Sequence, residues 1–168
     1  MHVALVGLSG SGKSEVGPLL ADRLGLRLVD VDDLVVERAG VSVPELFERE
    51  GEAAFRSLEA EVLRDELAGA PAVVATGGGV VTVASNRDLL ADRCRVVWLR
   101  TPVGVLVRRL EADAAQRPLL ADSPETTLRR LAAERESLYA AVADVVVDTG
   151  DLGPDDVADA VVEELEGD

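Results

Sequence analysis

The segment that most constrains how this chain folds is a glycine-rich stretch near its start, Gly7-Leu8-Ser9-Gly10-Ser11-Gly12-Lys13-Ser14. It reads G-x-x-x-x-G-K-S, directly after the apolar run Val3–Val6 and before a segment with helical spacing. In that context the pattern is typical of a phosphate-binding loop, because its glycines let successive backbone N–H groups surround a polyphosphate. The sequence therefore predicts a strand, a loop and a helix that hold a chain of phosphates.

Individual residues of this loop have separate predicted roles. Gly10, Ser11 and Gly12 present backbone N–H groups, and the start of the following helix adds a partial positive charge. Lys13 is expected to reach the β- and γ-phosphates, and the Ser14 hydroxyl to ligate Mg²⁺. Lys13 is also the only lysine among 17 basic residues, which mildly supports a specific role for a compact point charge.

The rest of the chain alternates short apolar runs with helical patterns. Its 168 residues fit a single domain spanning 1–168. Wholly apolar runs predict strands at Val3–Val6, Leu26–Val29, Ala72–Ala75, Val96–Leu99 and Val145–Val147. Helical spacing predicts helices from the loop to Leu24, over 32–39, 43–50, 51–67, 102–111 and 124–141, and after Pro154, with Ser123 as a capping residue. This alternation predicts an α/β fold with a parallel sheet covered on both faces.

Charge and composition exclude several classes of protein. A formal net charge of −15 disfavours nucleic acid and anionic membranes as partners. The single cysteine excludes an intrachain disulfide, and no run is long enough to span a membrane. The start lacks the features of a signal peptide, and His2, at what we expect to be a frayed end, receives no role. We therefore expect a cytoplasmic protein, and a monomer.

Polar and glycine residues follow two of the predicted strands. Asp30 and Asp32 come after the second strand and Gly77-Gly78-Gly79 after the third, which brings both to the same sheet edge as the loop. One aspartate could orient a water on Mg²⁺ and the other accept a hydroxyl proton. The alternatives are a turn carboxylate for Asp30, a helix N-cap for Asp32, and a tight strand-to-helix turn for the glycines.

Two arginines stand out by their positions on predicted helices. Arg135 falls on the apolar stripe of its helix, between Leu131 and Leu138, where it needs an anion or a buried salt bridge. Arg56 precedes Glu59 by three residues, a spacing that permits an ion pair able to orient the guanidinium. An exposed surface pair of little energetic value is the alternative for Arg56.

Three further candidates complete the predicted site. Phe47 and Phe55, the only phenylalanines, flank the Arg56 segment, although core packing is an equally good explanation. Arg117 lies in a stretch predicted to be a loop, about 112–123, and loops of this length are often lids. An arginine there could offset charge on a transferring phosphoryl group, or it could be an ordinary solvated side chain.

Taken together, these motifs resemble the shikimate kinase family over nearly the whole chain. The matching segments are Gly10–Ser14, Asp30-x-Asp32, Gly40-x-Ser42, Phe47, Gly51-Glu52-x-x-Phe55-Arg56-x-x-Glu59, Gly77–Gly79, Arg117-Pro118-Leu119-Leu120 and Arg135-x-x-x-Tyr139. The resemblance implies a three-layer P-loop kinase fold with a five-stranded parallel sheet in the order 2-3-1-4-5. It implies ATP-dependent phosphorylation of the 3-hydroxyl of shikimate, with Mg²⁺.

The resemblance also implies roles for single residues. Shikimate would be held within about 31–60, with Asp32 on its hydroxyls as the base. Arg56 and Arg135 would bind its carboxylate beside the Gly77–Gly79 backbone. Ser14 would ligate Mg²⁺ with support from Asp30, Arg117 would act from the lid, and Arg109 would stack on adenine.

The chain departs from the family pattern at three positions, Glu15, Val36 and Leu152, where threonine, glutamate and a polar or basic residue are usual. Glu15 is expected beside the α-phosphate, where a carboxylate would weaken ATP binding unless it turns outward. Two other functions stay open: a kinase for another small polyol acid such as gluconate, and a non-catalytic nucleotide-binding paralogue.

Overall fold

The computed structural model describes residues 1–113 and 123–167 of the chain. Five parallel strands form one sheet in the order β2-β3-β1-β4-β5, which confirms the expected order. The strands are β1 (His2–Val6), β2 (Arg27–Asp30), β3 (Ala72–Ala75), β4 (Cys94–Arg100) and β5 (Val145–Asp148).

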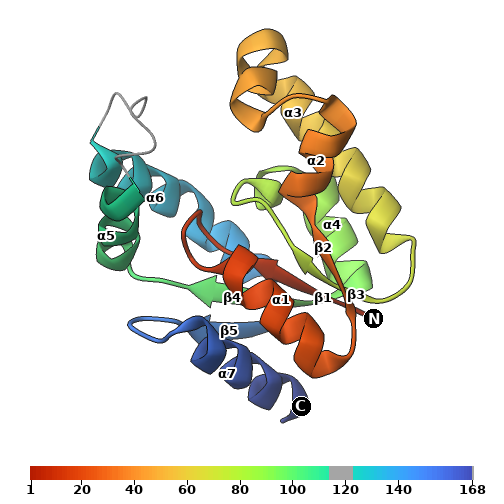
Figure 1. Ribbon diagram of the computed structural model, residues 1–168, viewed down its shortest axis with the longest axis vertical. Coiled ribbons are helices and arrows are strands. Elements are labelled where there is room, and N and C mark those ends of the chain that lie inside the picture. Colours follow the sequence, from red (N-terminus) through yellow and green to blue (C-terminus); the bar gives the residue numbers. More distant parts are fainter. Residues whose placement is uncertain (114–122, 168) are drawn as a thin grey trace.

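Helices cover both faces of this sheet, so the expected three-layer α/β fold is confirmed (Figure 1). On one face lie α1 (Lys13–Leu24) and α7 (Pro154–Glu166). The other face and its upper edge carry α2 (Val31–Ala39), α3 (Val43–Leu67), the short 3-10 helix η1 (Val80–Thr82), α4 (Ala84–Arg93), α5 (Val103–Asp113) and α6 (Pro124–Val142).

The central strand β1 shows why the strands read as continuous apolar runs. Ala4 and Val6 pack into the core shared with α3, α4 and α6. Val3 and Leu5 pack into the opposite core with α1 and α7. Because both faces of the strand are buried, neither can be polar. Along the described chain, no helix is long and apolar enough to cross a membrane.

The helix α3 contains a sharp break at Gly51. Its φ of 84° and ψ of 174° are not helical and suit only glycine, while nothing lies within 4 Å of the place a Cβ would occupy. Glycine is therefore required here by backbone conformation rather than by lack of space. The two predicted helices, 43–50 and 51–67, correspond to the two sides of this break.

The structure corrects one local prediction and refines another. The helix α4 was not predicted at all, since Leu89 and Leu90 are its only large apolar residues. Ser123 is the N-cap residue of α6, as predicted, but its side chain makes no capping hydrogen bond, and Pro124 follows in the first turn.

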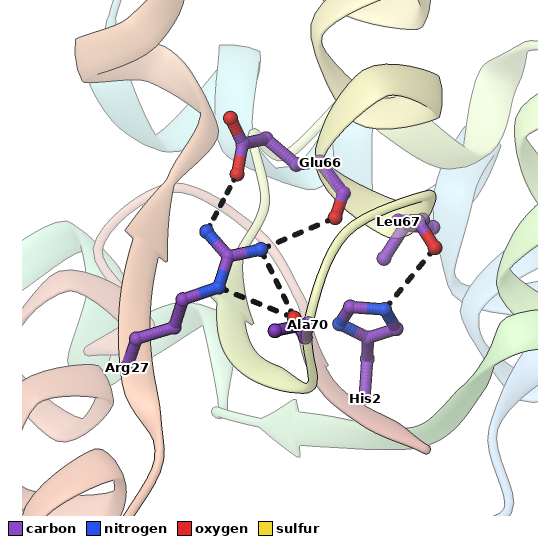
Figure 2. A network of polar contacts seen from close by, with 5 residues as sticks. All are labelled: His2, Arg27, Glu66, Leu67 and Ala70. Atoms are coloured by element: carbon purple, nitrogen blue, oxygen red, sulfur yellow. Dashed lines mark hydrogen bonds and ion pairs between the residues drawn. The ribbon is translucent and has the colours of Figure 1, made fainter.

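A third prediction, that the chain is frayed at His2, is wrong. His2 is 5% exposed, and its Nε2 lies 3.2 Å from the carbonyl oxygen of Leu67 at the end of α3. From β2, Arg27 donates to the Glu66 carboxylate at 2.8 Å and to the Ala70 carbonyl at 3.0 Å (Figure 2). The bond from His2 pairs the carbonyl of the last residue of α3, and all three bonds attach the end of α3 and the turn after it to β1 and β2.

Candidate active site

The glycine-rich segment forms a tight loop between β1 and α1. Gly7, Gly10 and Gly12 have φ angles of 149°, 86° and 99°, a region that residues with a Cβ rarely adopt. A Cβ on Gly7 would also lie 2.8 Å from the Leu99 carbonyl oxygen of β4. The loop therefore has the conformation that its sequence predicts, ending at the amino terminus of α1.

Lys13 lies along the inside of this loop and is only 7% exposed. Its Nζ donates to the carbonyl oxygens of Gly7 at 2.5 Å and Leu8 at 3.0 Å. Burial lowers the pKa of Lys13 to about 8, and the charge of Arg135 acts in the same direction, whereas Asp32 acts against it. The three charged side chains thus influence one another electrostatically across the site.

At the end of β2, Asp30 has two hydrogen-bond partners. Its Oδ1 accepts from the backbone N–H of Asp33 at 3.2 Å, so Asp30 is the N-cap of α2 and Asp32 is not. Its Oδ2 accepts from Ser14 Oγ at 3.3 Å. A hydroxyl and a carboxylate oxygen are therefore adjacent beside the loop, and such hard oxygen donors suit Mg²⁺.

Asp32, in the first turn of α2, points towards Gly77–Gly79, which we call the glycine triplet. A Cβ on Gly77 would lie 2.9 Å from Asp32 Oδ1 and 2.7 Å from Glu59 Oε2. Desolvation raises the pKa of Asp32, the charge of Asp30 raises it further, and Lys13 opposes both. A carboxylate with a raised pKa is better matched to accepting a proton near neutral pH.

Arg56 and Glu59 form the ion pair that their spacing predicts. Arg56 Nη1 lies 2.9 Å from Glu59 Oε1, and Glu59 is completely buried, so an exposed surface pair is the wrong interpretation. Burial raises the pKa of Glu59, while the charge of Arg56 acts against that shift. A Cβ at position 79 would overlap the Arg56 guanidinium, so glycine there allows the guanidinium to keep this position.

The two phenylalanines lie on the same side of the site as Arg56. Phe55 is 5% exposed, Phe47 is 36% exposed, and their ring centroids are 4.8 Å apart. Arg56 Cζ lies 5.1 Å from the centroid of the Phe55 ring. Phe55 therefore belongs to the core while Phe47 presents an aromatic surface to solvent.

Arg135 approaches the same triplet from α6. A Cβ on Gly78 would lie 3.4 Å from Arg135 Nη1 and 3.3 Å from the backbone nitrogen of Ser9 in the phosphate loop. Within residues 1–113 and 123–167, three buried polar atoms near the triplet have no hydrogen-bond partner: Arg56 Nε, Glu59 Oε2 and Arg135 Nε. Buried polar atoms are nearly always satisfied, so unpaired ones gathered at one place indicate a ligand site.

The remaining predicted residues divide into two groups. Arg109 Nη1, from α5, donates to the Gly10 carbonyl oxygen at 2.5 Å, which places it against the phosphate loop. Arg117 and most of the predicted lid fall within 114–122, outside the described residues. Glu59 and Tyr139 were not among the predicted site residues, although their i,i+3 and i,i+4 spacings from Arg56 and Arg135 indicate that they face the same region.

The three departures from the family pattern all lie at the surface. Glu15 is exposed in the first turn of α1, where a carboxylate also interacts favourably with the helix dipole. Val36 and Leu152 are 39% and 42% exposed. None of the three is buried within the phosphate loop.

Fold and site together define a class, the phosphotransferases that use a P-loop to pass a phosphoryl group to a small acceptor. Within this class, the family model described as "Shikimate kinase" matches residues 9–166. The chain belongs to the shikimate kinase family.

Individual relatives agree over the full length of the chain. It is 52% identical to a shikimate kinase of Halorhodospira halophila, covering 99% of this chain and 94% of that one. It is 46% identical to a shikimate kinase of a Synechococcus strain, covering 99% and 85%.

Solved structures agree as well. A shikimate kinase of Acinetobacter baumannii in complex with shikimate superposes with a TM-score of 0.93 at 36% identity, covering 99% of this chain and 93% of that chain. A shikimate kinase of Aquifex aeolicus superposes with a TM-score of 0.84 at 35% identity, covering 99% of this chain and 97% of that chain.

Proposed function

We propose that this chain transfers the γ-phosphoryl group of ATP to the 3-hydroxyl of shikimate, a step towards aromatic amino acids. The observation that carries the proposal is the group of unpaired buried atoms at the glycine triplet, two of them on guanidinium groups. Guanidinium groups bind carboxylates through paired, charge-assisted hydrogen bonds, and shikimate is a carboxylate with ring hydroxyls.

On the nucleotide side, the backbone N–H groups of Gly10, Ser11, Gly12, Ser14 and Glu15 would bind the phosphates. Lys13 would exchange its bonds to the loop carbonyls for the β- and γ-phosphates, since it already lies inside the loop. Its positive charge would offset the negative charge of the transferring phosphoryl group.

Mg²⁺ fits the adjacent oxygens of Ser14 and Asp30, which are 3.3 Å apart. When bound, it would supply further neutralisation of phosphate charge. Arg109 would contact the nucleotide base from its position against Gly10. From the sequence alone, Arg117 would add a positive charge at the phosphoryl group.

On the acceptor side, Arg56 and Arg135 would hold the carboxylate of shikimate against the Gly77–Gly79 backbone. Phe47 and Phe55 would contact the ring. Asp32 would accept hydrogen bonds from the ring hydroxyls and take the proton of the attacking 3-hydroxyl, consistent with its raised pKa. The protein would then take little part in covalent chemistry. Most of the rate acceleration would come from positioning the two substrates and from neutralising charge on the transferring phosphoryl group.

The family match and the relatives do not favour the two alternatives, a gluconate-type kinase and a non-catalytic paralogue. A steady-state assay of ADP release with shikimate, gluconate and quinate at equal concentration tests the proposal. We expect release to depend on shikimate and Mg²⁺, with the other two acids close to background. Turnover with gluconate alone, or binding of ATP and shikimate without turnover, would overturn it.

We also propose that the chain works in the cytoplasm as a monomeric single domain, with its substrate-binding segment at about 31–60. ATP is abundant in that compartment, and every proposed ligand of both substrates comes from one chain. Sedimentation at micromolar concentration would reveal a dimer if this proposal were wrong.

A further inference from the structure

Tyr139 lies entirely inside the protein, yet its hydroxyl reaches the glycine triplet. The residue has no exposed surface, and its ring packs against Trp98 with centroids 5.8 Å apart. Its Oη donates a hydrogen bond to the carbonyl oxygen of Gly78. This bond connects α6 to the turn that follows β3, and the two bonded residues are 61 positions apart in the sequence.

Arg135 lies one helical turn before Tyr139, so both side chains project from the same face of α6. The Arg135 guanidinium is close enough to Gly78 that a Cβ there would be 3.4 Å from Nη1. The same Cβ would be 3.3 Å from the backbone nitrogen of Ser9. Gly78 therefore lies between the phosphate loop and Arg135, and a shift of the turn relative to α6 would alter both distances.

We propose that Tyr139 is a positioning residue, whose hydroxyl fixes the glycine triplet relative to Arg135 so that the turn's backbone and the guanidinium face one ligand carboxylate together. The inference rests on the proposed function, because it takes that carboxylate to be the one on shikimate. Tyr139 does not itself touch the ligand and acts through the two groups that it connects.

The simpler explanation is that the hydroxyl of a buried tyrosine needs a hydrogen-bond acceptor, and that the Gly78 carbonyl merely serves as one. Two observations favour a positioning role. The acceptor belongs to the middle residue of the triplet, and the preceding turn of the same helix supplies Arg135, whose buried Nε is unpaired. Burial also raises the pKa of Tyr139 to about 12, so the hydroxyl remains a donor at any working pH.

The substitution Tyr139→Phe tests the inference, because it removes the hydroxyl and keeps the ring on Trp98. We expect the shikimate KM to rise roughly threefold to tenfold, the range for losing one hydrogen bond, with kcat and the ATP KM changed by less than about twofold. Calorimetric titration with shikimate should show the same loss in Kd.

Val142→Ala is the matched control, since Val142 packs against the same core from the last residue of α6 and has no hydroxyl to donate. It should lower Tm and leave the shikimate KM and Kd unchanged. If Tyr139→Phe behaves like this control, the hydroxyl is merely structural and the inference is overturned. If the wild-type chain shows no shikimate turnover, the proposed function fails and the inference fails with it.

Discussion

Arg56 Nη1 donates to Glu59 Oε1 at 2.9 Å, and the Glu59 carboxylate has no contact with solvent. A buried acid costs free energy unless a partner compensates its charge. Glu59 also faces the place where a Cβ on Gly77 would lie, so the pair borders the glycine triplet directly. The arginine is thereby oriented before any ligand arrives, which reduces the conformational entropy that binding must remove.

Replacing Arg56 by alanine should raise the shikimate KM by about a hundredfold, because two charge-assisted hydrogen bonds to a carboxylate are lost. The ATP KM should change by less than about twofold. Arg56→Lys keeps the charge without the planar fork, and should still raise the shikimate KM about tenfold. Steady-state kinetics with each substrate varied in turn measures all three values. An unchanged shikimate KM in Arg56→Ala would contradict the role given to Arg56.

The substitution Glu59→Gln should raise the shikimate KM about tenfold, since the neutral amide holds the guanidinium less firmly. Glu52→Gln is the matched control: Glu52 also pairs with Arg56, at 3.6 Å, but its side chain is 66% exposed. Exposed pairs contribute little, so this variant should behave like the wild type. Equal effects of the two substitutions would show that burial of Glu59 is irrelevant to the site.

Adding one methyl group at Gly79 should disable the site, because the new Cβ of Gly79→Ala overlaps the Arg56 guanidinium. We expect kcat/KM for shikimate to fall by at least about a hundredfold. The control is Gly104→Ala, since Gly104 lies in α5 with nothing within 4 Å of its Cβ position. That variant should be more stable by up to about 1 kcal/mol and fully active. A fully active Gly79→Ala enzyme would be inconsistent with the described geometry.

His2 should make stability fall on mild acidification. Burial lowers the pKa of His2 below its ordinary value of 6.5, so protonation is easier in the unfolded chain. The contribution of His2 to the free energy of unfolding is therefore intact above about pH 6.5, and it is lost as the pH falls through the folded-state pKa of His2.

His2→Gln keeps a donor for the Leu67 carbonyl and does not titrate. The Tm of the wild type should fall relative to this variant between about pH 7 and pH 5. Titration of Asp32 and Glu59, whose pKa values are raised, contributes equally to both proteins and cancels in the difference. Parallel Tm curves over that range would contradict the effect assigned to His2.

The parts of the molecule that depend on local spacing were predictable from the sequence. The phosphate loop and the Arg56–Glu59 pair involve residues at most a few positions apart, and the apolar runs directly indicate buried strands. The parallel sheet follows from their alternation with helices. Its strand order came from the resemblance to a family, because spacing alone does not set it.

The errors concern features fixed by distant parts of the chain. His2 is buried and hydrogen-bonded to the carbonyl of Leu67, 65 residues away, and no property of its sequence neighbours indicates this contact. The helix α4 has a weak apolar stripe, and it is held to η1 by a bond from Asn86 Nδ2 to the Val80 carbonyl at 3.0 Å. The unpaired atoms that mark the site on Arg56, Glu59 and Arg135 appear only when α3 and α6 meet the triplet.

The position of the phosphoryl group on the product tests the central claim most directly. Incubation with ATP, Mg²⁺ and shikimate, followed by phosphorus and proton NMR of the purified product, assigns the phosphorylated oxygen from its couplings. We expect a single ester at the 3-oxygen, formed in equal amount to ADP. An ester at another ring oxygen, or at the carboxylate, would contradict the placement of the carboxylate on Arg56 and Arg135 and of the hydroxyls on Asp32.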